Sequence, residues 1–165
     1  MSFTSTRYDF TDKDGDYARV AQELNALLAG ERDVIANAAN TSALIYDALP
    51  HLNWAGFYFL KDGELVVGPF QGKPACVRIP LGRGVCGTAA ATRETIVVAD
   101  VHAFPGHIAC DAASQSEIVI PLLKGGRGGE LLGVLDLDSP ALGRFDESDR
   151  RGLESLAAIF VESSF

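Results

Sequence analysis

The sequence is poor in cysteine and in basic residues. Its 165 residues include three cysteines, and 14 lysines and arginines stand against 22 aspartates and glutamates, for a net charge of −8. An odd number of cysteines disfavours a framework made only of structural disulfides. The acidic balance argues against a nucleic-acid partner, because phosphate binding needs a basic surface.

Long apolar runs are also missing. A membrane-spanning helix needs about 20 consecutive apolar residues, and the longest apolar run falls well short of that. The first residues, Met1 to Arg7, lack the apolar core of a signal peptide. We therefore expect a cytoplasmic protein without membrane contact, in a compartment that keeps thiols reduced. The simplest interpretation of free cysteines there is that they are buried small apolar residues.

Apolar residues recur at helical spacing near both ends of the chain and at strand spacing in the middle. Helices are predicted at 16–28, at about 31–49, over the short segment 84–91, and after an N-cap at Asp146. Predicted strands are 54–60, 64–68, 75–79, 96–98, 117–123 and 131–137. This order favours an α+β domain, with an antiparallel sheet and helices from both chain ends packed on it. The predicted domain is 14–165, after an N-terminal extension at 1–13.

Strand alternation sorts the candidate site residues by face. Asp136 and Asp138 are two positions apart, so both project from one face of their predicted strand. Trp54 and Tyr58 likewise share a face, on which the intervening glycine leaves room for a ligand, and phenylalanines on the opposite face are assigned to the core. Solvated acids at a strand end remain the alternative interpretation of the two aspartates.

Two patterns are rejected as cofactor or metal sites. The segment 82–87 matches G-x-G-x-x-G, but no βαβ pattern surrounds it, so its glycines are assigned to a tight turn and close helix packing. A zinc site made of His107 and the three cysteines is disfavoured, because the cysteines lack the short spacing of structural zinc sites. We expect no metal and no cofactor.

Five segments resemble the free methionine-(R)-sulfoxide reductases, a family of GAF-domain enzymes that act on the free amino acid. They are 53–58, 68–72, 84–88, 107–111 and 133–140, and they occur in the family's order within residues 14–162. The glycine-rich turn before Glu130 is longer than the family pattern predicts. The resemblance implies a GAF fold, a homodimer, and the reduction of free L-methionine-(R)-S-oxide to L-methionine.

The resemblance also implies roles for individual residues. Cys110 would attack the substrate sulfur, Cys76 would resolve the oxidised cysteine, and Cys86 would be an auxiliary partner. The remaining residues would bind substrate, with Trp54 and Tyr58 as an apolar wall and three acids beside them: Glu117, Asp136 and Asp138.

This residue set suits sulfoxide chemistry. A sulfoxide needs a nucleophilic sulfur and an acid near its oxygen. Acids that share one pocket cannot all ionise cheaply, so at least one should have a raised pKa and keep a proton. The other negative charges suit a substrate ammonium group, and they should not depress the pKa of the Cys110 thiol. Attack would give a sulfenic acid, then a disulfide that an external dithiol protein, thioredoxin, would reduce.

Two other functions remain open from the sequence. The chain could be a GAF module that binds a small ligand without turnover, or a thiol sensor that signals oxidation by forming a disulfide. Sensors usually carry an attached output domain, which the sequence lacks, and the acids would repel a nucleotide phosphate. The sequence therefore favours the enzyme.

Overall fold

The fold is a sheet with helices packed on both of its faces. The computed structural model describes residues 4, 6–108 and 110–165. Its sheet has six antiparallel strands in the order β3-β2-β1-β6-β5-β4. The strands are β1 (Trp54–Lys61), β2 (Glu64–Gly72), β3 (Arg78–Pro80), β4 (Ile96–Val98), β5 (Ser116–Lys124) and β6 (Glu130–Ser139). The prediction of an α+β domain with an antiparallel sheet is confirmed.

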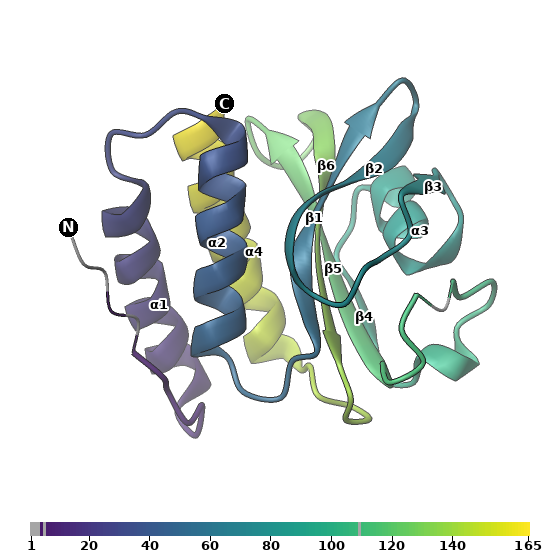
Figure 1. Ribbon diagram of the computed structural model, residues 1–165, viewed down its shortest axis with the longest axis horizontal. Coiled ribbons are helices and arrows are strands. Elements are labelled where there is room, and N and C mark those ends of the chain that lie inside the picture. Colours follow the sequence, from purple (N-terminus) through teal and green to yellow (C-terminus); the bar gives the residue numbers. More distant parts are fainter. Residues whose placement is uncertain (1–3, 5, 109) are drawn as a thin grey trace.

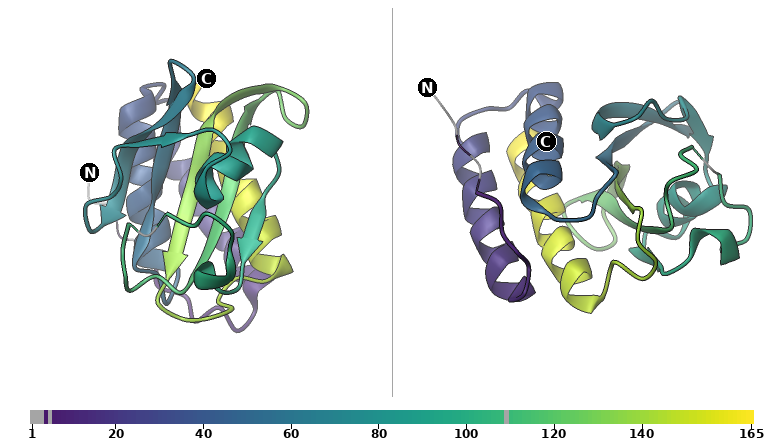
Figure 2. Two further views of the ribbon diagram at one scale, coloured as in Figure 1. Left: turned by 90° about the vertical axis from the view of Figure 1, so that its right-hand side faces the viewer. Right: turned by 60° about the horizontal axis from the view of Figure 1, so that its bottom comes forward.

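Three helices from the two ends of the chain cover one face of this sheet. Figure 1 shows them side by side on the left of the sheet: α1 (Lys13–Leu28), α2 (Val34–Ala48) and α4 (Glu147–Ser164). Each begins after an aspartate that caps it, and at α4 Asp146 and Asp149 form a reciprocal capping box. The opposite face carries the short helix α3 (Gly84–Thr92) and the loops around it (Figure 2).

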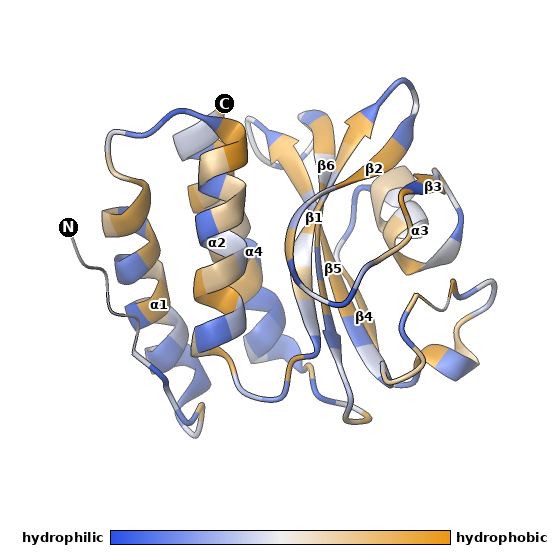
Figure 3. Cartoon of the chain, in the orientation of Figure 1, coloured by the Kyte–Doolittle hydropathy of each residue, from blue (hydrophilic) through white to orange (hydrophobic). Residues whose placement is uncertain are grey.

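One apolar cluster packs on each face of the sheet. Phe57 and Phe59 point toward the three helices, where both rings lie close to Phe160 of α4. Trp54 and Tyr58 point the other way, into a cluster that includes Cys86 of α3. Apolar residues accordingly dominate the central strands in Figure 3. The alternation predicted for the first strand is thus confirmed.

Several predicted element boundaries differ from the structure. The first helix begins at Lys13, three residues before its predicted start, and the second begins at Val34, after its predicted start near Glu31, because Asp33 caps it. The strand predicted at 75–79 is wrong in its first half: β3 begins only at Arg78. Pro74 cannot donate a backbone hydrogen bond, and the chain leaves the sheet there toward the site described below.

A short 3₁₀ helix, η1 (Val101–Ala103), interrupts a loop for which no helix is predicted. The loop returns to the sheet at β5, and Val101 anchors it through a backbone hydrogen bond to Gln115. Within the described ranges, no helix is both long and apolar enough to cross a membrane.

Candidate active site

The pairing of three neighbouring strands brings an aromatic residue and two acids into one row. Trp54 of β1 lies opposite Asp138 of β6, and Asp138 lies opposite Glu117 of β5. In the next row on the same face, Asp136 sits between β1 and β5. The prediction that Asp136 and Asp138 share a face is confirmed, and strand pairing adds Glu117 to that face.

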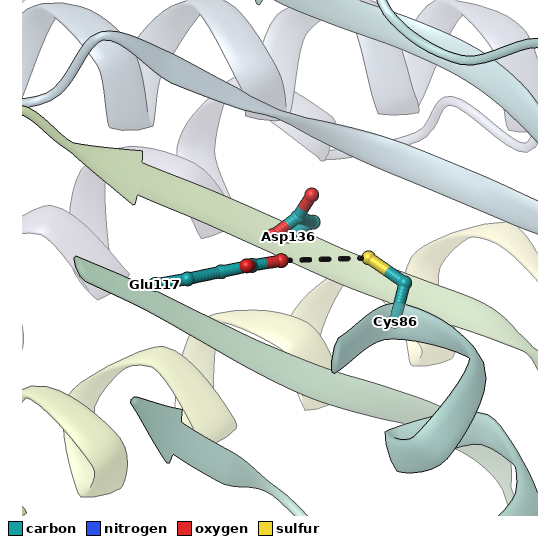
Figure 4. Close-up of side chains that lie close together, drawn as sticks. All are labelled: Cys86, Glu117 and Asp136. Carbon is teal, nitrogen blue, oxygen red and sulfur yellow. Dashed lines mark hydrogen bonds between the residues drawn. The ribbon is translucent and has the colours of Figure 1, made fainter. Parts of the chain in front are cut away.

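Helix α3 packs over this part of the sheet and carries Cys86. Gly87 lets the helix approach the end of β3, since a Cβ there would overlap the carbonyl oxygen of Pro80. This close approach places Cys86 over the acids: its thiol lies 3.8 Å from Glu117 Oε1 and donates to it (Figure 4). The assignment of these glycines to close packing agrees with the structure.

A cavity of about 550 Å³ of empty volume opens over the two rows. Its lining combines aromatic and apolar side chains with a few polar groups, as is typical of small-molecule sites. Seven of the eight predicted site residues line it: Trp54, Tyr58, Cys86, Cys110, Glu117, Asp136 and Asp138. The acids are therefore not solvated at a strand end, and Glu117 and Asp136 are only 6% and 5% exposed.

The eighth predicted residue, Cys76, reaches the site through Cys110. The two form a disulfide across 34 positions of the chain, with Cα atoms 5.9 Å apart. Cys110 is exposed and Cys76 is partly buried, whereas Cys86 is a free, buried thiol. The structure thus represents a state in which the proposed nucleophile and resolving cysteine are joined. The segment around Cys76 leaves the sheet where it crosses to this bond, which is why the predicted strand is shorter.

Burial controls the electrostatics of the acids. It raises the pKa of Asp136 to about 6. Burial, followed by repulsion from neighbouring carboxylates, raises the pKa of Glu117 and of Asp138 well above the usual range. The same two causes raise the pKa of the Cys86 thiol. At neutral pH the pocket therefore retains protons on carboxyl groups, as the sequence predicts, and Cys86 is a neutral thiol in the absence of a ligand.

The aromatic wall is stacked and has little room to move. The Trp54 ring lies between Tyr58, with centroids 5.8 Å apart, and Phe70 of β2, at 5.1 Å. The room expected beside Gly56 is not open to a ligand, because a Cβ there would overlap Phe70. The cavity lies instead over the acids, and its lining includes residues of α3 and of the loops that carry Lys73 and Cys110.

Sequence reasoning named His107 only within the rejected zinc site, and it missed Lys73 and Asp111, which also line the cavity. His107 Nε2 lies 3.9 Å from Glu117 Oε2, and Lys73 Nζ lies 3.8 Å from Asp111 Oδ1. Burial, with a smaller effect of His102, lowers the pKa of His107, so its contact with Glu117 is not an ion pair at neutral pH. The closeness of His107 and Asp111 to Cys110 in the sequence was the available signal.

Comparison with known proteins gives the class of the chain. A model of the GAF domain family matches residues 17–161. The free methionine-R-sulfoxide reductase of Escherichia coli is 57% identical over 142 residues, which cover 86% of this chain and 84% of that protein. The enzyme of the same name from Saccharomyces cerevisiae is 46% identical, covering 81% of this chain and 77% of that protein.

Solved structures agree with these sequence matches. A free methionine-R-sulfoxide reductase from Neisseria meningitidis, in complex with its substrate, has a TM-score of 0.88 and 44% identity, covering 98% of this chain and 94% of that chain. The reduced form of fRMsr of Staphylococcus aureus has a TM-score of 0.85 and 50% identity, covering 89% and 94%. The chain belongs to the GAF domain family and, within it, to the free methionine-R-sulfoxide reductases.

Proposed function

We propose that this protein reduces free L-methionine-(R)-S-oxide to L-methionine, with Cys110 attacking the substrate sulfur inside the cavity. One observation carries the assignment of the site: Cys110 lines the same cavity as Trp54 and the buried acids, and it is bonded to Cys76. The aromatic wall and the acids of the cavity suit the side chain and the ammonium group of an amino acid, in keeping with the substrate named for the relatives in this family.

The reaction has two chemical steps at Cys110. Its sulfur attacks the sulfoxide sulfur, oxygen is transferred with a proton to leave a cysteine sulfenic acid, and methionine departs with its sulfur reduced by two electrons. The thiol of Cys76 then attacks the sulfenic sulfur and expels water, which forms the Cys76–Cys110 disulfide. The disulfide present in the structure is the product expected from this second step.

The buried acids have complementary roles in this scheme. A protonated carboxyl group donates to the sulfoxide oxygen, which makes the sulfur a better electrophile. Asp138, next to Trp54 in the first row, would bind the substrate ammonium group as a carboxylate, because the incoming positive charge lowers its raised pKa, while the methyl group packs on the indole. Cys86 positions Glu117 through its hydrogen bond and takes no electrons in the main cycle.

The reductant, the assembly and the location are further parts of the proposal. An external dithiol protein, thioredoxin, would reduce the disulfide by exchange, and the exposure of Cys110 gives such a protein access to it. A homodimer is inferred from the family. A cytoplasmic location is inferred from the few cysteines of the chain. Nothing in the proposal requires a metal or an organic cofactor.

Single-turnover stoichiometry tests the assignment of Cys110. The fully reduced protein, freed of reductant, is mixed with each epimer of methionine sulfoxide, and free methionine is counted per chain. We expect one methionine per chain from the R epimer in the wild type. Cys76→Ser should also give one, because the sulfenic acid still forms, whereas Cys110→Ser should give none.

Mass spectrometry of the same samples shows whether the disulfide has formed. The wild type should gain a Cys76–Cys110 link, and Cys76→Ser should not. Methionine release by Cys110→Ser would remove Cys110 as the nucleophile. Tight binding of the R epimer by the reduced wild type without any release of methionine would instead indicate a binding module.

A further inference from the structure

The floor of the cavity gathers three atoms that commonly bind metals. Cys86 Sγ of α3 and carboxylate oxygens of Glu117 (β5) and Asp136 (β6) all lie within 4.8 Å of one another. Figure 4 shows the Cys86 thiol facing the Glu117 carboxylate, with Asp136 beside them. A helix and two paired strands hold the backbones of these three residues.

An unsatisfied acceptor marks this point as a binding position. Asp136 is 5% exposed, yet its Oδ1 has no hydrogen-bond partner within the described part of the chain. Buried polar atoms are nearly always paired. Asp136 is also one of the residues that line the cavity, so a ligand bound there can approach its carboxylate. A cation bound among the three groups would contact a carboxylate oxygen of Asp136 together with the Cys86 sulfur and Glu117.

The separations fit a tetrahedral soft cation. Bond lengths of about 2.3 Å to sulfur and about 2.0 Å to oxygen place the two ligand atoms about 3.5 Å apart in a tetrahedral zinc site. Cys86 Sγ and Glu117 Oε1 are 3.8 Å apart, and the Asp136 oxygen lies within 4.8 Å of both ligand atoms, so binding would draw the three side chains closer together. His107 Nε2 lies 3.9 Å from the other Glu117 oxygen and is not counted among the ligands of this group.

We propose that Cys86, Glu117 and Asp136 form a binding site for a soft divalent cation, Zn²⁺ or Cd²⁺, at the floor of the substrate cavity. The thiol loses its proton on binding and ligates as a thiolate. A sulfur ligand selects such ions over Mg²⁺ and Ca²⁺, which prefer sites made only of oxygen. This donor set differs from the one rejected on spacing, because two of those cysteines are consumed by the Cys76–Cys110 disulfide.

The site persists when the redox cysteines are oxidised, since Cys86 remains a free thiol. A bound cation would occupy the acids that face the sulfoxide, so it should compete with substrate and arrest the enzyme. This consequence for turnover rests on the function proposed above, whereas binding of the cation does not.

Cadmium titration of the full-length disulfide form, without substrate, tests the site. Cadmium–thiolate bonds absorb in the ultraviolet, and calorimetry of the same sample counts the ions. We expect one Cd²⁺ per chain with thiolate absorption, and no response to Mg²⁺. Cys86→Ser should abolish the absorption, and Asp136→Asn should weaken affinity at least tenfold. The double variant Cys76→Ser/Cys110→Ser is the matched control and should keep both signals.

Circular dichroism confirms that each variant is folded before it is titrated. Absorption that survives in Cys86→Ser, that disappears in the double variant, or that is missing from the wild type would overturn the proposal. Methionine-(R)-sulfoxide added to the wild type should raise the apparent Kd for Cd²⁺. If the protein binds Cd²⁺ as expected but never releases methionine, only the proposed function fails. If it releases methionine but binds no Cd²⁺, only the cation site fails.

Discussion

The buried carboxylate of Asp149 allows a sharp test of which part of the fold provides stability. Its side chain is fully buried and pairs with Lys13 Nζ at 2.6 Å and Arg144 Nη1 at 3.1 Å. It also accepts hydrogen bonds from the Tyr17 hydroxyl at 2.8 Å and the Asp146 backbone N–H at 2.9 Å. This carboxylate therefore ties the start of α1 to the start of α4, behind the sheet.

Asp149→Asn keeps the shape of the side chain and removes its charge. Breaking a buried pair from one side costs about 3 to 5 kcal/mol, because the remaining charge stays buried. Arg144 is 7% exposed, so its charge stays buried when the carboxylate is lost. Lys13 is 24% exposed, so its charge can reach water. We therefore expect the lower end, about 3 kcal/mol, which for a chain of this size lowers Tm by about 6 to 12 °C.

Thermal unfolding followed by circular dichroism at pH 7 measures the effect. The matched control is Asp14→Asn, which removes a carboxylate that is 68% exposed and paired with Arg151 at 3.2 Å. Exposed pairs contribute about 1 kcal/mol or less, so the control should melt close to the wild type. Equal melting temperatures for Asp149→Asn and the control would refute the reasoning. Turnover at low temperature should be unchanged in both, because neither carboxylate lines the cavity.

Three further predictions concern pH, substrate contact and helix packing. Partial burial acts to raise the pKa of Asp146, but hydrogen bonds from Lys13 and the Asp149 backbone outweigh it and lower that pKa to about 2. The ionised Asp146 therefore stabilises the fold above its ordinary pKa, and this effect is lost as pH falls toward 2. The free energy of unfolding should fall on acidification by about 1 kcal/mol less in Asp146→Asn than in the wild type, after allowance for exposure. Identical acid profiles of the two proteins would contradict this. Trp54→Ala should lower kcat/KM for the R epimer by about tenfold to about 200-fold through lost apolar contact, and unchanged kinetics would remove Trp54 from the site. Gly87→Val should lower both Tm and turnover, because its side chain meets backbone at the end of β3, and wild-type values of both would disprove the close packing.

Sequence periodicity was sufficient to sort residues by face but not to order the strands. Alternation places Asp136 and Asp138 together because the side-chain period of a strand is two, whatever lies beside it. The row of Trp54, Asp138 and Glu117 depends on β6 inserting between β1 and β5. That pairing joins segments more than 60 positions apart through non-local packing, and it has no local sequence signal.

Irregular segments account for most of the errors. Cys76 follows Pro74 in a run rich in β-forming residues, so local propensity predicts a strand there. The tertiary bond to Cys110 overrides that propensity. The contact between His107 and Glu117 also depends on how a loop folds back over the sheet. The resemblance to a family could name the cysteines and acids, but only coordinates show what surrounds them.

The two faces of the sheet divide stability from chemistry. The helical face buries a large apolar cluster, whereas the opposite face buries carboxyl groups whose pKa is raised by burial. A raised pKa means that stability is full below the ordinary pKa and is lost as pH rises through the raised value, so these acids weaken the fold at neutral pH. Changes on the helical face should therefore lower stability and spare turnover. Loss of a cavity acid, as in Glu117→Gln, should instead raise stability and lower turnover. A Glu117→Gln protein that is less stable than the wild type and keeps full turnover would show that this division is wrong.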